Sequence, residues 1–184
     1  MKLDAPLVEL FDHPVDALLA ALPSAEDAMW EKFARRRAMP MHAATRTIAF
    51  LWVEDWNGVG EPAVWQFDYA PPALLAAAQA CAERLAARFG GSVSRLMLVD
   101  LPAGAAVAEH RDVRPGVTLV HRCHLPVVTN DRVSFTIDGM DHRLEAGRCY
   151  EFDNTRKHAV ANRGGDWRVH LICDILPPAD QRGA

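Results

Sequence analysis

The chain has 184 residues, of which 50% are hydrophobic and 24% are charged. This composition excludes a disordered chain, and the length suits one hydrophobic core, so we expect a single domain over residues 1–184. The formal net charge of -4 argues against a nucleic-acid partner. No run reaches the roughly 18 apolar residues of a membrane span and no apolar signal stretch opens the chain, which favours a soluble cytoplasmic protein.

Helical patterns come first along the chain. Residues 14–22 and 24–37 are each expected to form a helix, and Ser24 with Asp27 gives the second one a start like a capping box. Arg35-Arg36-Arg37 lies at its end, where the helix dipole favours positive charge. We expect this basic run to be a solvated face without a functional role.

Two strands and a longer helix should follow. The apolar, β-branched segment 47–53 predicts a buried strand, and residues 64–67 predict a shorter one. The alanine-rich stretch from Pro71 to Phe89 begins with proline and ends before Gly90, which is typical of a helix.

Beyond Ser92 the pattern changes to short apolar runs separated by turn residues. Asp138-Gly139 between two such runs predicts a hairpin, because these residues tolerate the positive φ angles of a tight turn. This spacing of short strands and turns is typical of an all-β sandwich or barrel. The expected strands cover residues 96–101, 117–128, 133–137, 149–152, 159–161 and 169–176.

The four cysteines are Cys81, Cys123, Cys149 and Cys173, and none forms a CxxC motif. Three of them lie in apolar strand-like runs, where cysteine behaves as a small hydrophobic residue. We therefore expect reduced, buried thiols.

Two histidines and an aspartate form a candidate iron site. On an extended strand, residues i and i+2 face the same way, so His110 and Asp112 can present two ligands to one point while His158 arrives from another strand. Two imidazoles and one carboxylate leave three coordination positions open, as in non-haem Fe(II) oxygenases. A His-x-Asp motif alone is weak, and each histidine could equally be a hydrogen-bonded surface residue.

Further polar residues alternate with apolar ones on two predicted strands. Arg122 and His124 share one face of the first, and Arg168 and His170 share one face of the last. A buried guanidinium needs an anion, so Arg122 either pairs with an internal carboxylate such as Asp153 or binds a ligand carboxylate. A structural ion pair is the alternative for either arginine.

The order of these motifs resembles the 2-oxoglutarate-dependent aspartyl/asparaginyl β-hydroxylase family. The resemblance rests on His-Arg-Asp at 110–112, His-Arg-Cys-His-Leu-Pro at 121–126, Gly-Arg-Cys-Tyr-Glu-Phe-Asp-Asn-Thr-Arg-Lys-His at 147–158 and Arg-Val-His-Leu-Ile-Cys-Asp at 168–174. It covers about residues 94–177. The His-Arg-Asp text is also similar to that of bacterial free-proline cis-hydroxylases.

This resemblance implies a mainly β fold with flanking helices, in which residues 93–178 form a double-stranded β-helix of the cupin-like jelly-roll type. Residues 1–92 would be a helical and mixed flanking region with outer strands. The resemblance also implies that His110, Asp112 and His158 hold Fe(II) as the catalytic centre. It assigns the 2-oxoglutarate site to Arg168, Arg122, His124 and His170, with O₂ as the other co-substrate.

One departure from the family concerns the anchor of the co-substrate. Arg168 would bind the distal carboxylate of 2-oxoglutarate, with Arg122 and His124 at positions that help to hold it. A serine that assists this carboxylate in aspartyl hydroxylases falls at Val99 here, so that contact must be made otherwise.

The expected activity is hydroxylation of an unactivated carbon of an amino acid, first of all an aspartyl/asparaginyl-type residue in a peptide or protein. A free amino acid such as proline is the alternative substrate, and a non-enzymatic metal- or carboxylate-binding sensor is the alternative function. Four residues of the N-terminal half could line the substrate entrance, although a strand tryptophan is more often core. They are Arg46, Trp52, Glu54 and Trp56.

Overall fold

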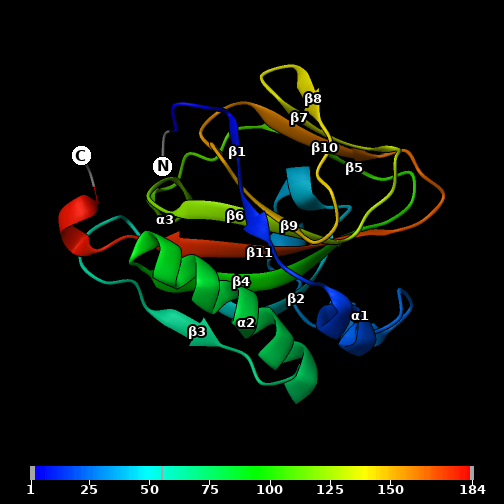
Figure 1. The fold of residues 1–184 in the computed structure, drawn as a ribbon, viewed down its shortest axis with the longest axis horizontal. Coiled ribbons are helices and arrows are strands. Elements are labelled where there is room, and N and C mark those ends of the chain that lie inside the picture. Colours follow the sequence, from blue (N-terminus) through cyan, green and yellow to red (C-terminus); the bar gives the residue numbers. More distant parts are fainter. Residues whose placement is uncertain (1–2, 55, 183–184) are drawn as a thin grey trace.

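Two antiparallel sheets face each other in the computed structural model, which describes residues 3–54 and 56–182 (Figure 1). Within these residues the larger sheet has the strand order β1-β9-β6-β11-β4-β2-β3, and the smaller has the order β5-β10-β7-β8. The strands are β1 (Leu7–Asp12), β2 (Arg46–Val53), β3 (Val64–Gln66), β4 (Ser92–Leu101), β5 (Ala106–His110), β6 (His121–Val128), β7 (Val133–Ile137), β8 (Met140–His142), β9 (Arg148–Phe152), β10 (His158–Asn162) and β11 (Arg168–Leu176).

From β4 onward the chain passes back and forth between the two sheets. β4, β6, β9 and β11 belong to the larger sheet, whereas β5, β7, β8 and β10 belong to the smaller one. Such alternation wraps one antiparallel ribbon into a two-layered barrel. The predicted double-stranded β-helix, or jelly roll, is confirmed.

The helices α1 (Asp16–Ala21) and α2 (Pro72–Phe89) cover the outer face of the larger sheet (Figure 1). The long α2 begins with Pro72 at its first turn and ends at Gly90, which adopts a left-handed φ of 62° that suits glycine. Its buried face packs on a core that includes Phe50, Leu98 and Leu171. The helical elements are α1 (Asp16–Ala21), α2 (Pro72–Phe89), α3 (Pro115–Thr118) and the 3₁₀ turns η1 (Ala28–Glu31), η2 (Arg36–Ala38), η3 (Pro40–His42) and η4 (Ala179–Gln181).

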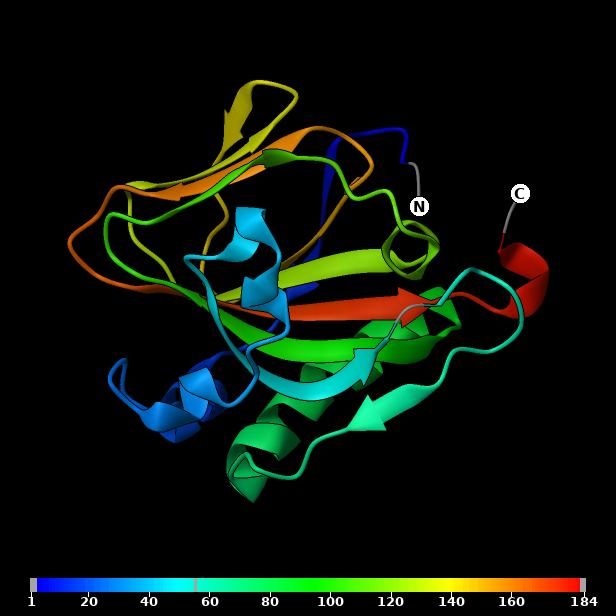
Figure 2. The same ribbon diagram turned by 180° about the vertical axis from the view of Figure 1, so that it is seen from behind.

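The prediction of one helix over residues 24–37 is wrong. This segment forms separate 3₁₀ turns, because contacts of individual side chains with the rest of the protein override its helical pattern. The Trp30 indole is fully buried and its Nε1 donates to the Ser24 carbonyl oxygen at 3.0 Å, while the Phe33 ring packs on Trp52 at 5.0 Å. In Figure 2 the turns that follow, in light blue, lie between the two sheets at the open side of the barrel.

Other element predictions differ at the edges. The strand expected from residue 117 starts only at His121, because Pro115–Thr118 forms a short helix. Strand β1 lies in a segment for which the sequence predicted none. The extended strand expected through His110 and Asp112 is β5, but it ends at His110. The Asp138-Gly139 hairpin is confirmed, with φ angles of 48° and 80°.

Strand β11 separates a dry core from the barrel interior. Val169, Leu171, Cys173 and Ile175 belong to the core beneath α2, whereas the residues between them face the barrel. A second apolar cluster, which includes Leu101, Phe135 and Phe152, fills the space between the sheets at one end. All four cysteines are buried and unbridged, as predicted.

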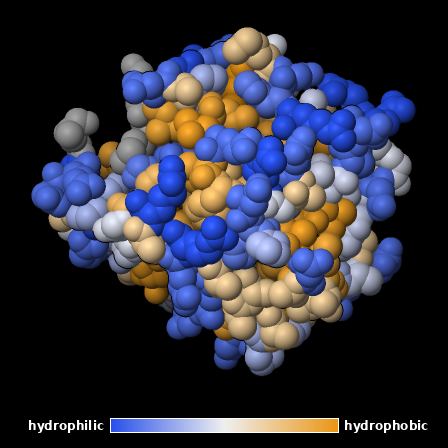
Figure 3. Space-filling model, viewed as in Figure 1, coloured by the Kyte–Doolittle hydropathy of each residue, from blue (hydrophilic) through white to orange (hydrophobic). Residues whose placement is uncertain are grey.

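On the surface seen in Figure 3, hydrophobic areas are separated by hydrophilic side chains. None of the helices in the described residues is both long and apolar enough to cross a membrane.

Candidate functional site

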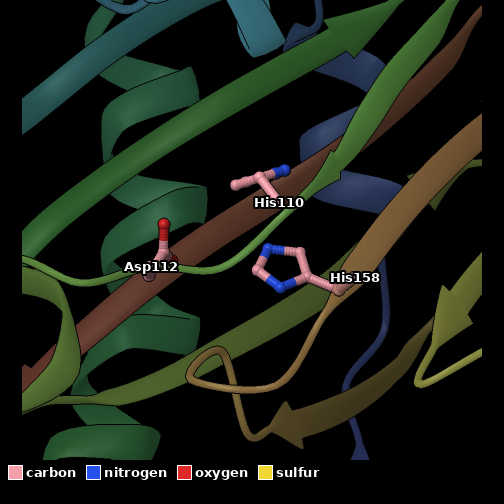
Figure 4. A group of neighbouring side chains, drawn as sticks. All are labelled: His110, Asp112 and His158. Carbon is pink, nitrogen blue, oxygen red and sulfur yellow. The ribbon is translucent and has the colours of Figure 1, made fainter.

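His110, Asp112 and His158 come together at one end of the barrel (Figure 4). Each offers a ligand atom, and these atoms all lie within 4.8 Å of one another. His110 ends β5 and pairs directly with His158, the first residue of β10. Asp112 follows in the loop, where its backbone N–H donates to the Asn154 carbonyl oxygen at 3.0 Å. The three predicted ligands are thus neighbours, although Asp112 lies just beyond the strand.

Backbone contacts orient both imidazoles. Nδ1 of His110 lies 2.8 Å from the Ala108 carbonyl oxygen, and Nδ1 of His158 lies 2.9 Å from that of Arg156. A carbonyl oxygen can only accept, so each Nδ1 carries the proton and each Nε2 keeps a lone pair. That tautomer is the one that a metal ion requires.

Burial keeps His158 neutral, and neighbouring positive and polar groups keep Asp112 ionised. Burial lowers the pKa of His158 to about 4. Burial alone would raise the pKa of Asp112, but Arg122, His158 and the amide of Asn154 outweigh it and the pKa is lowered. A neutral His158 imidazole and an ionised Asp112 carboxylate are therefore available at neutral pH.

A buried network holds Asp112 in place. Arg122 donates to its Oδ2 at 2.6 Å, and Asn154 Nδ2 donates to the same oxygen at 2.9 Å. Arg122 also forms a two-point pair with Asp174, at 2.9 and 2.7 Å, and Asp174 lies 3.5 Å from Arg95. The partner expected for Arg122 among internal carboxylates was Asp153, and this is wrong. Asp174 and Asp112 pair with Arg122 instead, because all three side chains lie in the interior of the barrel.

Asp153 instead serves the loop before His158. Its Oδ1 accepts from the backbone N–H and the hydroxyl of Thr155 at 3.1 and 2.5 Å. Together with the Asn154 contacts, this gives Asp153-Asn154 an architectural role in the turn before His158.

Arg168 lies deeper in the barrel beside two histidines. The Arg168 Nη2 and the His170 Nδ1 are 2.5 Å apart, and the His170 and His124 Nδ1 atoms are 3.3 Å apart. Arg168 is 3% exposed, its Nε has no partner, and within the described residues it forms no ion pair. A buried guanidinium without a carboxylate is costly, so this position fits an anionic ligand.

Two neighbouring cavities, which share several lining residues, reach the cluster. The outer pocket has a volume of about 670 Å³ and is bordered by His110 and Asp112. The inner one measures about 40 Å³ and lies among His158, Arg168 and the rings of Phe135 and Phe152. An external molecule can therefore approach the cluster from one side and an anion from the other.

Of the four residues proposed for the entrance, three line the outer pocket: Trp52, Glu54 and Trp56. Arg46 does not line it. Its guanidinium instead pairs with the buried Asp100 and donates to the Ala25 carbonyl oxygen at 2.6 Å.

Sequence reasoning missed three residues of the site. Asp174 could have been found, because it continues the alternation of Arg168, His170 and Ile172 on β11. His42 and Arg36 carried no such signal, since they lie on isolated 3₁₀ turns. The His42 ring packs against that of His110, with 5.1 Å between ring centroids.

The fold and site define the class of protein: a jelly roll with a two-histidine, one-carboxylate cluster inside the barrel. A family model described as aspartyl/asparaginyl beta-hydroxylase matches residues 72–178, which is more than half of the chain. The chain belongs to this family and is a hydroxylase of the oxygenase type. A search of curated protein sequences finds no match.

Solved structures with similar folds include three that align over nearly the whole chain. An oxidoreductase of the 2OG-Fe(II) oxygenase family from Burkholderia pseudomallei has a TM-score of 0.61 at 14% identity, with 98% of this chain and 90% of that chain covered. AviO1 from Streptomyces viridochromogenes Tue57 has a TM-score of 0.55 at 17% identity, covering 95% and 90%. A prolyl-4-hydroxylase from Pseudomonas putida has a TM-score of 0.53 at 17% identity, covering 95% and 94%. At these identities the likeness shows the fold.

The buried histidines predict loss of stability in mild acid. Burial and the charge of Arg168 hold the pKa values of His124 and His170 well below their ordinary 6.5. As the pH falls below about 6.5 the unfolded chain binds protons that the folded chain does not. Each of the two histidines should then lower the unfolding free energy by about 1.4 kcal/mol per pH unit.

Denaturant unfolding of metal-free protein between about pH 7 and about pH 5 measures this slope. The variant His170→Gln should unfold with a shallower pH dependence. Equal slopes for the two proteins would contradict a neutral, buried His170.

Proposed function

We propose that this protein uses Fe(II), 2-oxoglutarate and O₂ to hydroxylate an unactivated carbon of an amino acid, in the first place an aspartyl/asparaginyl-type residue of a peptide or protein. The observation that carries the proposal is the convergence of two Nε2 lone pairs and one carboxylate on a point open to a large pocket. Membership of a hydroxylase family supports it. Bound iron and 2-oxoglutarate would supply the oxidising chemistry.

The residues present fit these groups. His110, Asp112 and His158 would hold the metal ion, with Arg122 and Asn154 fixing the carboxylate from behind. The unpartnered Arg168 Nε fits one carboxylate of 2-oxoglutarate at the far end of the inner cavity. Val99 borders that cavity where the family has a serine, so Arg168 would hold the carboxylate without this hydroxyl.

The outer pocket suits a substrate with more bulk than one small amino acid. A volume of about 670 Å³ lies within the range of roughly 300–1,000 Å³ of ligand pockets. Trp52, Trp56 and Met97 give it apolar walls, which would exclude water from the reacting carbon. The neighbours of a target residue in a peptide could occupy the wider part.

Anaerobic addition of Fe(II) and 2-oxoglutarate tests the co-substrate site directly. The loaded protein should develop a visible charge-transfer band, and His158→Ala should lose it because the third ligand is gone. His142→Ala, on the distant β8 hairpin, is the matched control and should keep it. A well-folded unmodified protein without a band would count against the proposed function.

Substrate-dependent release of succinate then tests turnover. Panels of aspartyl and asparaginyl peptides, and of free amino acids including proline, should separate the two substrate forms. If the band forms but no member of either panel stimulates succinate release, a non-enzymatic sensor becomes the better interpretation.

A further inference from the structure

Arg36 differs from the two arginines beside it. Arg35 pairs with Glu54 and Arg37 pairs with Glu31 near the protein surface, as expected for a solvated basic run. Arg36 is only 9% exposed and turns into the barrel. The expectation that the whole run is a solvated face is therefore wrong at its central residue.

The buried charge of Arg36 lacks a carboxylate. Its Nη1 donates to the Thr45 hydroxyl at 3.3 Å, and within residues 3–54 and 56–182 it forms no ion pair. Burial, followed by repulsion from Arg122, lowers the pKa of Arg36 to about 10, so the group stays charged at neutral pH. A buried cation without a counterion is unfavourable unless a ligand supplies one.

Thr45 fixes the position of this guanidinium. Its hydroxyl donates to the His42 carbonyl oxygen at 2.8 Å while it accepts from Arg36. The two 3₁₀ turns that carry Arg36 and His42 are thereby joined into one wall of the cavity, visible in light blue between the sheets in Figure 2. The side chain is thus held in place before any ligand arrives.

Arg36 lies where the two cavities meet. It borders both of them, together with His42 and His110, whereas Arg168 borders only the inner one. The other arginine at this junction, Arg122, already has Asp112 and Asp174 as partners. Arg36 is therefore the cation at the junction that a molecule in the outer pocket can still neutralise.

Arginines predominate among the charged residues that line the outer pocket, although the chain as a whole is acidic. Its described lining contains six arginines and two carboxylates, and one of the carboxylates, Asp112, belongs to the metal cluster. A pocket of this kind attracts anions and raises their local concentration.

We propose that Arg36 binds a carboxylate of the substrate and holds it beside the metal cluster. The assignment rests on the hydroxylase function proposed above and narrows its substrate class to carboxylate-bearing molecules. An aspartyl residue would be preferred over an asparaginyl residue, because a guanidinium pairs with a carboxylate at two points and gains little from a neutral amide. In a free amino acid, the α-carboxylate would take the same place.

Binding to the anaerobic protein loaded with Fe(II) and 2-oxoglutarate tests this role without turnover. Short peptides that differ only in Asp or Asn, and free L-proline with its carboxamide, are the probes. Changes in the visible band report their binding. The unmodified protein should bind the acid of one pair at least about 100-fold more tightly than its amide, since a site built around one charged contact rejects an analogue that lacks it.

The variant Arg36→Gln should lose this preference while retaining its affinity for 2-oxoglutarate. Arg36→Lys should keep part of the preference, because it keeps the charge but loses the two-point contact. The matched control is Arg37→Gln. Arg37 belongs to the same run but pairs with Glu31 near the surface, so this variant should bind both probes like the unmodified protein. A preference for the Asp peptide over the Asn peptide would indicate a peptide carboxylate as the ligand of Arg36. A preference for L-proline over its carboxamide would indicate the α-carboxylate of a free amino acid.

Three results would overturn the assignment. Equal affinity for the acid and the amide in both pairs would show that the protein does not recognise a substrate carboxylate. A parallel loss of 2-oxoglutarate affinity in Arg36→Gln would place Arg36 in the co-substrate site. A lower unfolding temperature of Arg36→Gln would show a structural role, because removal of an uncompensated buried charge should leave stability unchanged or raise it. Failure of the hydroxylase function itself is recognised separately, by the absence of the band in the unmodified protein.

Discussion

Asp112→Ala should abolish hydroxylation while leaving the protein folded. Loss of a side chain that only hydrogen-bonds to a metal ligand already costs about 10–100-fold in activity or metal affinity, so loss of the ligand itself should exceed about 100-fold. The fold should survive because Arg122 keeps its two-point pair with Asp174. Iron content after gel filtration and substrate-dependent succinate release measure the effect.

The matched control is Glu109→Ala. Glu109 lies three residues earlier, is about half exposed and pairs with Lys157 at 3.1 Å outside the cluster. It should retain iron and turnover. An Asp112→Ala protein with normal iron content and turnover would mean that another carboxylate serves the metal.

Asp174→Asn should cause the largest loss of stability among the substitutions considered. The Asp174 side chain is fully buried and contacts both Arg122 and Arg95. An amide would leave two buried guanidiniums without their main counterion, and breaking a buried pair in this way costs about 3–5 kcal/mol. Denaturant unfolding of the metal-free protein measures the difference.

Asp12→Asn is the control for this change. Asp12 also pairs with an arginine, Arg148 at 3.1 Å, but its side chain is 77% exposed. Exposed pairs contribute about 0–1 kcal/mol, so the control should unfold close to the unmodified protein. If both variants lose the same unfolding free energy, the burial of Asp174 is not the cause of the loss in Asp174→Asn.

The sequence predicted the parts of the site that follow a period of two. His110 with Asp112, Arg122 with His124, and Arg168 with His170 each lie two residues apart, and all six side chains meet inside the barrel or at its mouth. Strand alternation alone places such pairs on one face. The family resemblance supplied what alternation lacks, namely that His158 joins them.

Contacts between distant segments could not be predicted in this way. The Asn154 amide reaches Asp112, and Asp174 reaches Arg122, only because the loop before β10 and the strand β11 converge in three dimensions. The turns at 28–42 form where buried Trp30 and Phe33 override a helical pattern. Arg36 is distinguished from its neighbours by burial alone, which an arginine run does not reveal.

The match to the family begins at residue 72, so it includes the metal cluster and Arg168 but not the 3₁₀ turns around Arg36 and His42. Those turns, with Trp52 and Trp56, line the outer pocket beside the metal ligands. With Arg36 as the proposed substrate contact, the metal ligands and this contact are encoded in different stretches of the chain. On that assignment, a change of specificity requires only the replacement of a short, irregular segment, while the strands that position the metal continue to fold as before.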